Sequence, residues 1–386
     1  MLQVIAAIFI VIFFIPYTAS GFAACGKLFS SLFGVKYLTA MIISAIVIVA
    51  YTTLGGFLAA STTDFIQSII MSVALIVVLI FGVETAGGIS AVIHNASELP
   101  GYLSMTLSYD VNTGKAAPYS ALTIVSTAAW GLGYFGMPHI LLRFMAIEDE
   151  KKLKLSRRVA TIWVVISLFV AVFIGVIGYT MSKVGALEML TGSNSETIIV
   201  KISALLSQHG VIFALLAGVI LAGILASTMS TSDSQLLAAS SAVSSDILGA
   251  FRKDSSNKNG SMAAARITLL VISVVAAFIA RNPDSSVFAI VSFAWAGFGA
   301  AFGPVVLFSL FWKRTNKWGA LAGMVCGGSM VFIWKYLIRP LGGIWNIYEL
   351  LPAFLIACAA IVIVSLLTPK PSKEIEEEFD RVAQMK

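Results

Sequence analysis

Apolar residues in this chain fall in long runs that are separated by short polar breaks. A helix needs about 20 mostly apolar residues to cross the hydrocarbon core of a bilayer. Ten runs reach or approach that length, and they occupy residues 2–25, 36–60, 64–85, 119–145, 158–181, 210–247, 266–281, 286–312, 318–338 and 347–368. The pattern predicts an all-α polytopic protein with about ten transmembrane helices. Residues 1–368 form one transmembrane domain, and residues 369–386 form a charged tail.

Composition supports this class and excludes others. Hydrophobic residues make up 59% of the 386 positions and charged residues only 11%, whereas a soluble domain carries about 25% charged residues. The net charge of +6 comes from short basic clusters between apolar runs, so no nucleic-acid-binding face is expected. Cys25, Cys326 and Cys358 are scattered through apolar sequence, which indicates neither a disulfide framework nor a metal site.

Basic residues collect in every second break between the predicted helices. Cytoplasmic loops of membrane proteins hold the excess of Lys and Arg. The breaks after the fourth, sixth and eighth spans carry this excess at Arg143, Lys151, Lys152, Lys154, Arg157, Arg158, Arg252, Lys253, Lys258, Arg266, Lys313, Arg314 and Lys317. We therefore expect a multi-pass protein of the plasma (inner) membrane with both termini in the cytoplasm. The loops at 86–117 and 182–209 are then outside.

The fourth predicted span contains a helix-breaking sequence. Between Trp130 and Pro138 lie three glycines, which weaken a helix, and the proline removes a backbone donor. In lipid, irregular backbone survives only where it is buried in protein or lines a wet cavity. We predict that the helix unwinds here and forms a candidate binding site. A kinked packing helix is the alternative, because glycine and proline are common in membrane helices.

The same glycines match a dinucleotide-binding fingerprint only as a string. Gly131, Gly133 and Gly136 have the spacing G-x-G-x-x-G, but that motif requires a preceding strand and a βαβ unit. An apolar span supplies neither, so the match is a coincidence. In the eighth span, Gly299 and Gly303 form a small-xxx-small pair, which favours close helix packing.

Four hydroxyl residues lie along one face of the sixth predicted span. Ser227, Ser230, Thr231 and Ser234 are spaced at i, i+3, i+4 and i+7, which places them in one helical stripe. Sodium is a hard cation that prefers oxygen ligands, and two hydroxyls with a main-chain carbonyl would supply about half of its shell. Alternatively, Ser and Thr in membrane helices bond back to their own backbone or join neighbouring helices.

Two carboxylates and one imidazole also fall within or beside the predicted spans. Asp233 is costly near lipid and should face the bundle interior or a water-filled cavity, as a gate, a proton carrier or a structural partner. Asp64 follows three hydroxyl residues at the start of the third span, where it caps the helix or lies on a cation path. His139 directly follows Pro138 and is interpreted as a hydrogen-bonded packing residue.

Several segments together resemble the sodium:solute symporter family. They are Phe14-Ile-Pro-Tyr-Thr-Ala-Ser-Gly21, the stretch from Tyr51 to Asp64, the stretch from Trp130 to Pro138, and Arg143-Phe-Met-Ala146. Ser230-Thr231 and the stretches 295–306 and 312–323 extend the likeness almost to the tail. Within the family, the likeness is to members that carry proline. The resemblance implies a secondary transporter rather than an enzyme, with sodium as the coupling ion and no other cofactor.

The resemblance also implies a core of two five-helix inverted repeats. Solute and ion bind near the bilayer midplane, where the first helix of each repeat is broken. By this likeness Trp130, Tyr134 and Pro138 contact the substrate proline, and Tyr17 is a partner tyrosine on an adjacent helix. Aromatic rings suit the apolar ring of an imino acid, while half-helix dipoles meet its carboxylate.

The ion-binding residues are implied in the same way. Ser230 and Thr231 offer hydroxyls to sodium, Ser227 offers its main-chain carbonyl, and Asp64 lies on the inward path of the ion. By alignment the chain begins at the third core helix of the family, so the first repeat is truncated and the sodium shell is partial. The expectation is a fragment of a longer symporter. The alternatives are a shortened sensor or partner protein, or a symporter for another small organic solute.

Overall fold

Long helices dominate the computed structural model, which describes residues 1–111, 113–251 and 258–384, without the side chains of 56–59, 251 and 258–261. Arg252 and Lys253, counted among the cytoplasmic basic residues, lie outside the described residues. The long helices are α1 (Leu2–Phe33), α2 (Tyr37–Thr85), α6 (Leu153–Lys183), α8 (Val211–Ser241), α10 (Lys258–Ile279), α11 (Val287–Phe311), α12 (Lys317–Ile333) and α13 (Leu350–Leu367). Within the described residues, nine helical stretches are long and apolar enough to cross a membrane. The protein is therefore a multi-pass membrane protein.

Shorter elements connect these helices. The short α-helices are α3 (Ile89–Ser97), α4 (Ala121–Ala128), α5 (Pro138–Met145), α7 (Ile198–Ser207), α9 (Leu248–Phe251) and α14 (Lys373–Gln384). Segments of 3₁₀-helix are η1 (Ala129–Gly136), η2 (Glu150–Lys152), η3 (Gly192–Thr197), η6 (Arg339–Leu341) and η7 (Gly343–Asn346), and π-helical turns are η4 (Ala242–Ile247) and η5 (Trp334–Ile338).

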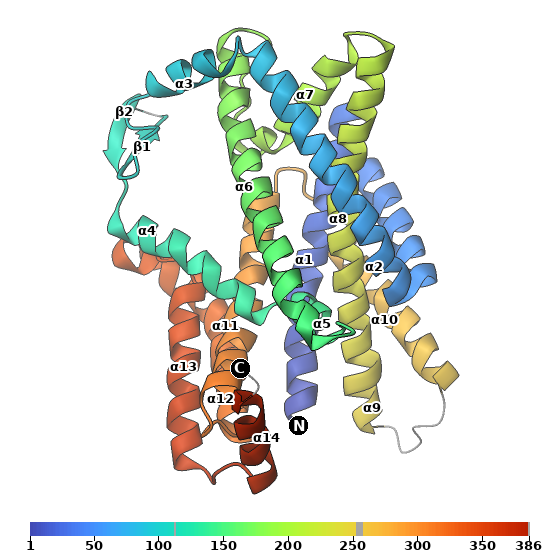
Figure 1. Ribbon diagram of the computed structural model, residues 1–386, viewed down its shortest axis with the longest axis vertical. Coiled ribbons are helices and arrows are strands. Elements are labelled where there is room, and N and C mark those ends of the chain that lie inside the picture. Colours follow the sequence, from blue (N-terminus) through green and yellow to red (C-terminus); the bar gives the residue numbers. More distant parts are fainter. Residues whose placement is uncertain (112, 252–257, 385–386) are drawn as a thin grey trace.

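Helix α2 joins two predicted spans. It is continuous over 49 residues, and at about 1.5 Å per residue a straight helix of that length would far exceed a bilayer core of about 30 Å. Its apolar stretches Tyr37–Gly55 and Ala60–Thr85 are each long enough to cross. They run as two rods that meet at an angle (Figure 1). The ranges 36–60 and 64–85 of the sequence prediction correspond to these rods.

The predicted span 119–145 is divided into three short elements, α4, η1 and α5. The Ser120 side chain caps α4 by accepting a hydrogen bond from the Thr123 N–H at 3.1 Å. Met137 adopts an extended conformation, and Pro138 starts α5 at its first position, where a missing N–H has no helical partner to lose. The interruption lies where the glycines and the proline predict it.

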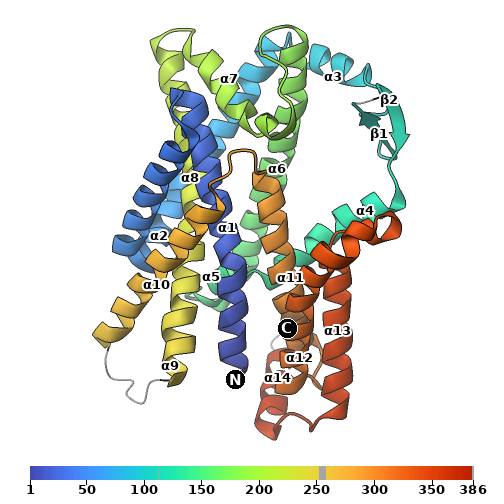
Figure 2. The same cartoon turned by 180° about the vertical axis from the view of Figure 1, so that it is seen from behind.

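Helix α1 forms the centre of the packing. Phe13, Phe14 and Phe22 are fully buried, and the cluster around them includes residues of α2, α8, α10 and α11. A helix that is apolar on all sides is stable only when it is enclosed. The second view shows α1 lying between the group of α8 and α10 and the group of α11, α12 and α13 (Figure 2).

A β-hairpin departs from the all-α expectation. Strands β1 (Leu107–Asp110) and β2 (Lys115–Pro118) pair antiparallel within the loop predicted at 86–117. Gly114 has a positive φ of 65°, and its N–H bonds the Asp110 carbonyl at 2.8 Å to close the turn. Glycine adopts this left-handed conformation without a steric penalty.

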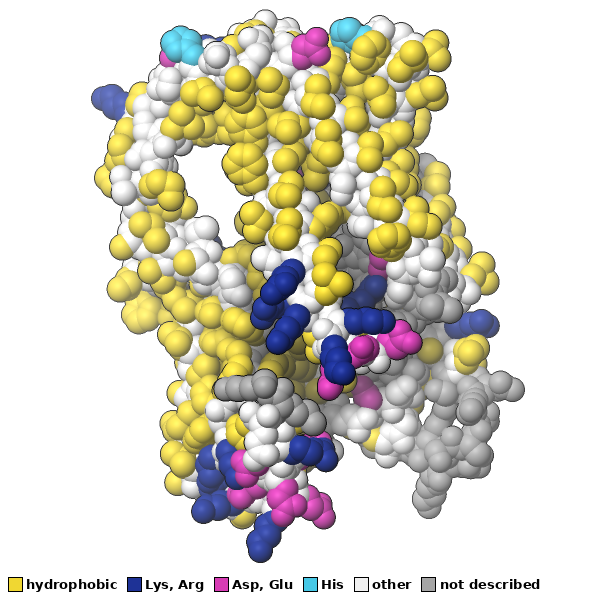
Figure 3. All heavy atoms as spheres, viewed as in Figure 1, with side chains coloured by type: hydrophobic (Ala, Val, Ile, Leu, Met, Phe, Trp, Pro, Cys, Tyr) yellow, Lys and Arg dark blue, Asp and Glu magenta, His cyan; other side chains and the backbone are white. Residues whose placement is uncertain are grey.

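Charge is distributed unevenly along the long axis. On the face shown in Figure 3, Lys and Arg side chains gather on the lower half, over the start of α6 and around α14. The N-terminus and α14 lie toward this same end (Figure 1). Helix α14 is held by an ion pair of 2.6 Å between Lys313 and Asp380. The tail is therefore helical over residues 373–384 and attached to the end of α11.

Candidate functional site

The interrupted segment η1 lies against α11 through its aromatic side chains. The Trp130 ring stacks on Trp295 at 5.4 Å between centroids, on Phe288 at 5.3 Å and on Tyr348 at 5.9 Å. Tyr134 meets Trp295 edge to face at 4.8 Å and 86°. Two of the residues predicted to contact substrate therefore share one neighbour, Trp295.

Tyr17 and Pro138 lie on the other side of the break. Tyr17 of α1 is 9% exposed, and its ring centroid is 6.0 Å from that of His139, the residue that follows Pro138 in α5. The structure thus places Tyr17 beside the start of α5 and places Trp130 against α11.

His139 packs as predicted but without the expected hydrogen bond. Its ring meets Phe14 at 5.7 Å and Tyr17 at 6.0 Å. The Nδ1 atom is buried and has no hydrogen-bond partner in the part of the chain that the structure describes. Burial among aromatic rings, rather than a polar contact, fixes this side chain.

Three oxygens predicted to bind sodium converge on α8. The Ser227 carbonyl accepts hydrogen bonds from the Ser230 hydroxyl at 3.2 Å and from the Thr231 hydroxyl at 2.9 Å. The Ser227 hydroxyl turns away and bonds the Ile224 carbonyl at 2.8 Å. Back-bonding of this kind is the alternative that the sequence left open. The same geometry also places both hydroxyl oxygens within hydrogen-bond distance of one carbonyl oxygen.

Arg143 joins the broken helix to the hydroxyl stripe. Its guanidinium forms a close ion pair with Asp64 of α2 and donates to the Ser61 hydroxyl at 3.2 Å and to the Ser234 hydroxyl at 2.8 Å. One side chain of α5 therefore contacts both α2 and α8. From the sequence, Arg143 was interpreted as a cytoplasmic charge and as part of a family-like segment, without a partner assigned to it. A carboxylate at the edge of an apolar span needs a partner, so Asp64 was the signal in the sequence that could have indicated this ion pair.

Asp233 is a second carboxylate close to this network. Its side chain is fully buried, and within the described residues neither carboxylate oxygen has a hydrogen-bond partner. Asp64 lies within electrostatic range of it, and the Oδ1 atom of Asp64 is likewise unbonded among those residues. Asp64 is neutralised by Arg143, so Asp233 is the carboxylate of this network whose two oxygens lack a hydrogen-bond partner among the described residues.

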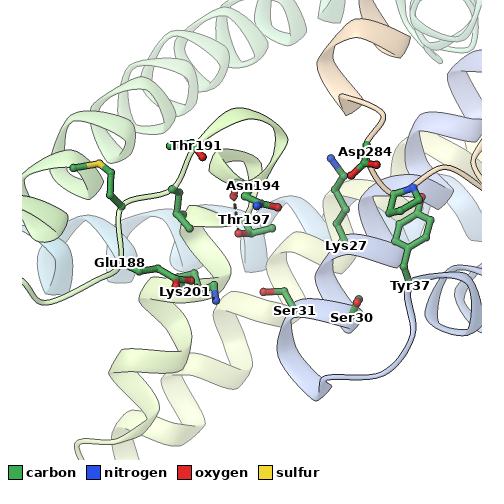
Figure 4. Close-up of a pocket in the computed structure, with 13 residues that line it drawn as sticks. Lys27, Ser30, Ser31, Tyr37, Glu188, Thr191, Asn194, Thr197, Lys201 and Asp284 are labelled. Atoms are coloured by element: carbon green, nitrogen blue, oxygen red, sulfur yellow. Dashed lines mark hydrogen bonds and ion pairs between the residues drawn. The ribbon is translucent and has the colours of Figure 1, made fainter. Parts of the chain in front are cut away.

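The opposite end of the molecule carries a polar cavity of about 390 Å³. Lys27 and Asp284 lie on one side of it and Lys201 and Glu188 on the other (Figure 4). Lys201 pairs with Glu188 at 2.9 Å, and Lys27 pairs with Glu196 at 2.7 Å. Both lysines that line the cavity are therefore already neutralised by carboxylates.

Glu196 also caps the start of α11. It accepts hydrogen bonds from the Ser286 hydroxyl at 2.9 Å and from the N–H groups of Val287 and Phe288 at 3.3 and 3.4 Å. Burial raises the pKa of this carboxyl, but the bonds from Lys27, Ser286 and Val287 outweigh that effect, so its pKa is lowered. One carboxylate thus connects η3, α1 and α11.

An interrupted membrane helix beside a helix with converging oxygens defines a membrane transporter of the broken-helix type. The fold is that of a solved sodium-coupled sialic acid symporter in a substrate-bound, outward-open state, with a TM-score of 0.72 at 17% identity, over 96% of this chain and 76% of that one. The chain belongs to the sodium:solute symporter family, whose model matches residues 1–327. The family resemblance seen in the sequence is confirmed, and the protein is a transporter rather than an enzyme.

Three relatives narrow the comparison within the family. The chain is 38% identical to the osmoregulated proline transporter of Bacillus subtilis, over 97% of this chain and 72% of that protein. It is 40% identical to the sodium/proline symporter of Haemophilus influenzae, over 99% and 74% of the two chains. With the sodium/proline symporter of Salmonella typhimurium the identity is 38%, over 98% and 72%.

Proposed function

We propose that this protein transports proline together with sodium into the cell. The observation that carries the proposal is the break from Trp130 to Pro138, which packs against α11 and leads into α5. The relatives of this chain include proline transporters. The rings of Trp130 and Tyr134 suit the apolar ring of proline. The positive end of the α5 dipole suits its carboxylate, because a helix N-terminus favours negative charge.

The coupling ion is assigned to the oxygens on α8. The Ser227 carbonyl and the Ser230 and Thr231 hydroxyls provide three ligands. The hydroxyls keep free lone pairs while they donate, so sodium has to displace only the hydrogen bonds that occupy the carbonyl. Asp233 lies on the same helix, and Asp64 of α2 is linked to that helix through Arg143, which supports a path for the ion from these oxygens toward the cytoplasm. Arg143 neutralises part of that path.

The orientation follows from charge. We assign the end that carries both termini, the start of α6 and α14 to the cytoplasm, because Lys and Arg accumulate there. The β-hairpin, α7 and the cavity beside Lys27 then face outward. In this orientation the membrane potential drives sodium inward with about 2.3 kcal/mol per 100 mV, enough to concentrate solute roughly fiftyfold.

The test is uptake of radiolabelled proline by proteoliposomes that contain the protein. We expect uptake to require an inward sodium gradient and to increase with an inside-negative potential. Excess unlabelled proline should abolish it, and other small amino acids or carboxylic acids should compete poorly. Uptake without sodium would contradict the coupling, and uptake of another solute in place of proline would contradict the substrate. No uptake of any solute would favour a sensor or partner role.

A further inference from the structure

We propose that Trp295 of α11 is the positioning residue of the solute site. This inference deepens the proposed function and rests on it for the identity of the solute. Trp295 touches the broken segment in two ways, through its indole N–H and through its ring. Its role is to hold the 3₁₀ backbone of η1 and both aromatic side chains in one arrangement before solute binds.

The N–H contact holds the backbone of η1. The Trp295 Nε1 atom donates to the carbonyl of Trp130 at 2.9 Å, across 165 positions of sequence. Trp295 is 6% exposed, so this bond forms away from solvent. A main-chain carbonyl in a broken membrane helix needs a partner from the surrounding protein. Trp295 supplies it at the residue where the break begins.

The ring contact holds both aromatic residues of the proposed pocket. Trp130 lies nearly parallel to the Trp295 ring, at 15° and 5.4 Å, and Tyr134 lies almost perpendicular to it, at 86° and 4.8 Å. Offset stacking and edge-to-face contact are the preferred geometries of aromatic pairs. Because the Trp130 and Tyr134 rings both pack against the Trp295 ring, a shift of Trp295 would displace both of them.

The glycines of the break make this close approach possible. A Cβ atom added at Gly133 would lie 2.0 Å from the Trp295 Nε1 atom, and one at Gly136 would lie 2.2 Å from the carbonyl oxygen of Phe298 in α11. Neither distance is tolerable, so both positions exclude a side chain. These glycines therefore serve to dock the segment on α11 as well as to unwind it. That docking surface is centred on Trp295.

Trp334 offers a matched control within the same chain. Its Nε1 atom also donates to a main-chain carbonyl, that of Ile347, at 3.2 Å. Trp334 lies in η5, and its ring contacts that of Trp345 at 5.9 Å with a tilt of 58°. The same chemical change at the two positions removes the same type of bond, and only one of the bonds reaches the break.

The experiment replaces each tryptophan with 3-benzothienylalanine, which keeps the fused ring but has sulfur in place of the N–H. A Trp295→Phe variant reduces the ring as well. The first readout is hydrogen–deuterium exchange of residues 129–137 in lipid nanodiscs without solute. We expect exchange there to become about tenfold faster with the Trp295 substitutions, as loss of a bond of about 1.4 kcal/mol would produce, and to stay unchanged with the Trp334 substitution.

The second readout is the KM for proline uptake at saturating sodium. We expect it to rise about tenfold for the benzothienyl variant at Trp295 and further for Trp295→Phe, with the KM for sodium unchanged. Unaltered exchange at 129–137 in the Trp295 variants would overturn the proposal, as would equal effects at Trp334. If the unsubstituted protein takes up no proline, the assignment of the solute fails, and the exchange measurement alone decides the role of Trp295.

Discussion

The guanidinium of Arg143 pairs with the carboxylate of Asp64 across 79 positions of sequence, and this pair links the second half of the broken helix to α2. The same guanidinium donates to Ser234 of α8, one helical turn beyond the oxygens assigned to sodium. A movement of α5 would therefore act on α8, the helix that we propose binds the ion. This link is the most direct connection between the two proposed sites.

Replacing Arg143 should impair coupling more than solute binding. In Arg143→Gln, Asp64 keeps its charge but loses its ionic partner, and Arg143→Lys keeps the charge but loses the planar fork that reaches three acceptors. We expect the KM for sodium to rise about tenfold in Arg143→Gln and less in Arg143→Lys, as measured by sodium titration of proline uptake. A double variant with Asp64→Asn should recover folded protein, because it leaves no unpaired charge. Equal sodium KM values in all variants would contradict the link.

The hydroxyl stripe predicts a selective effect on sodium. Ser230→Ala and Thr231→Val each remove one oxygen ligand, and a hydrogen-bonding group that meets a charge contributes about 1.5–3 kcal/mol. We expect each change to raise the KM for sodium by at least about tenfold at little cost in protein yield. Ser309→Ala is the control, since its hydroxyl also bonds back to its own helix, at the Val305 carbonyl. A comparable loss in the control would show that only helix packing is affected.

Trp130→Ala should weaken solute binding with sodium affinity retained. It removes a ring stacked on three aromatic neighbours and one wall of the proposed pocket. Aromatic pairs contribute about 0.5–1.5 kcal/mol beyond their burial, so we expect the KM for proline to rise at least about tenfold. Trp163→Ala, which removes a partly exposed tryptophan of α6, should leave it unchanged. Unaltered proline affinity in Trp130→Ala would remove the aromatic pocket from the proposal.

Glu196 makes stability depend on pH at the end that we assign to the outside. Its pKa is lowered in the folded protein, so its contribution is present above the ordinary pKa of about 4.3 and is lost as the pH falls through the lowered value. We expect the difference in Tm between the unsubstituted protein and Glu196→Gln to shrink from pH 7 toward pH 3. A difference that stays constant over this range would show that the carboxylate does not act through its charge.

Cysteine labelling tests the assigned orientation. In a background without Cys25, Cys326 and Cys358, Thr113→Cys in the hairpin turn should react with a membrane-impermeant maleimide on intact cells. Glu377→Cys in α14 should react only after the membrane is permeabilised. The reverse pattern would invert the protein and place its termini outside.

The break and its aromatic residues could be predicted from the sequence because they lie in one contiguous segment. Glycine and proline between Trp130 and Pro138 weaken a helix wherever it is placed. The hydroxyl stripe was accessible for the same reason, since its period is that of a helix. The roles of Trp295 and Arg143 were not, because each depends on contacts with residues far away in the chain. Trp295 was seen only as part of a packing span.

Local sequence rules did not predict two features of the fold, the β-hairpin and the continuity of α2. The turn at Thr113 and Gly114 was a usable signal for the hairpin, but the strands around it have four residues each and lie in a loop next to long apolar runs. The continuity of α2 was equally invisible. Its two apolar rods were predicted from length, whereas the helical backbone between them depends on their packing in the bundle.

The doubly bonded carbonyl of Ser227 has a consequence for how an ion leaves. Its two hydrogen bonds from Ser230 and Thr231 occupy both lone pairs of the carbonyl oxygen from within the helix. A sodium ion that left the proposed site would therefore not leave the carbonyl without partners, and an arriving ion would have to compete with the bonds already made. Both effects limit the residence time of the ion. A carrier must release its ion in every cycle, and ligands that hydrogen-bond to one another in the absence of the ion favour that release.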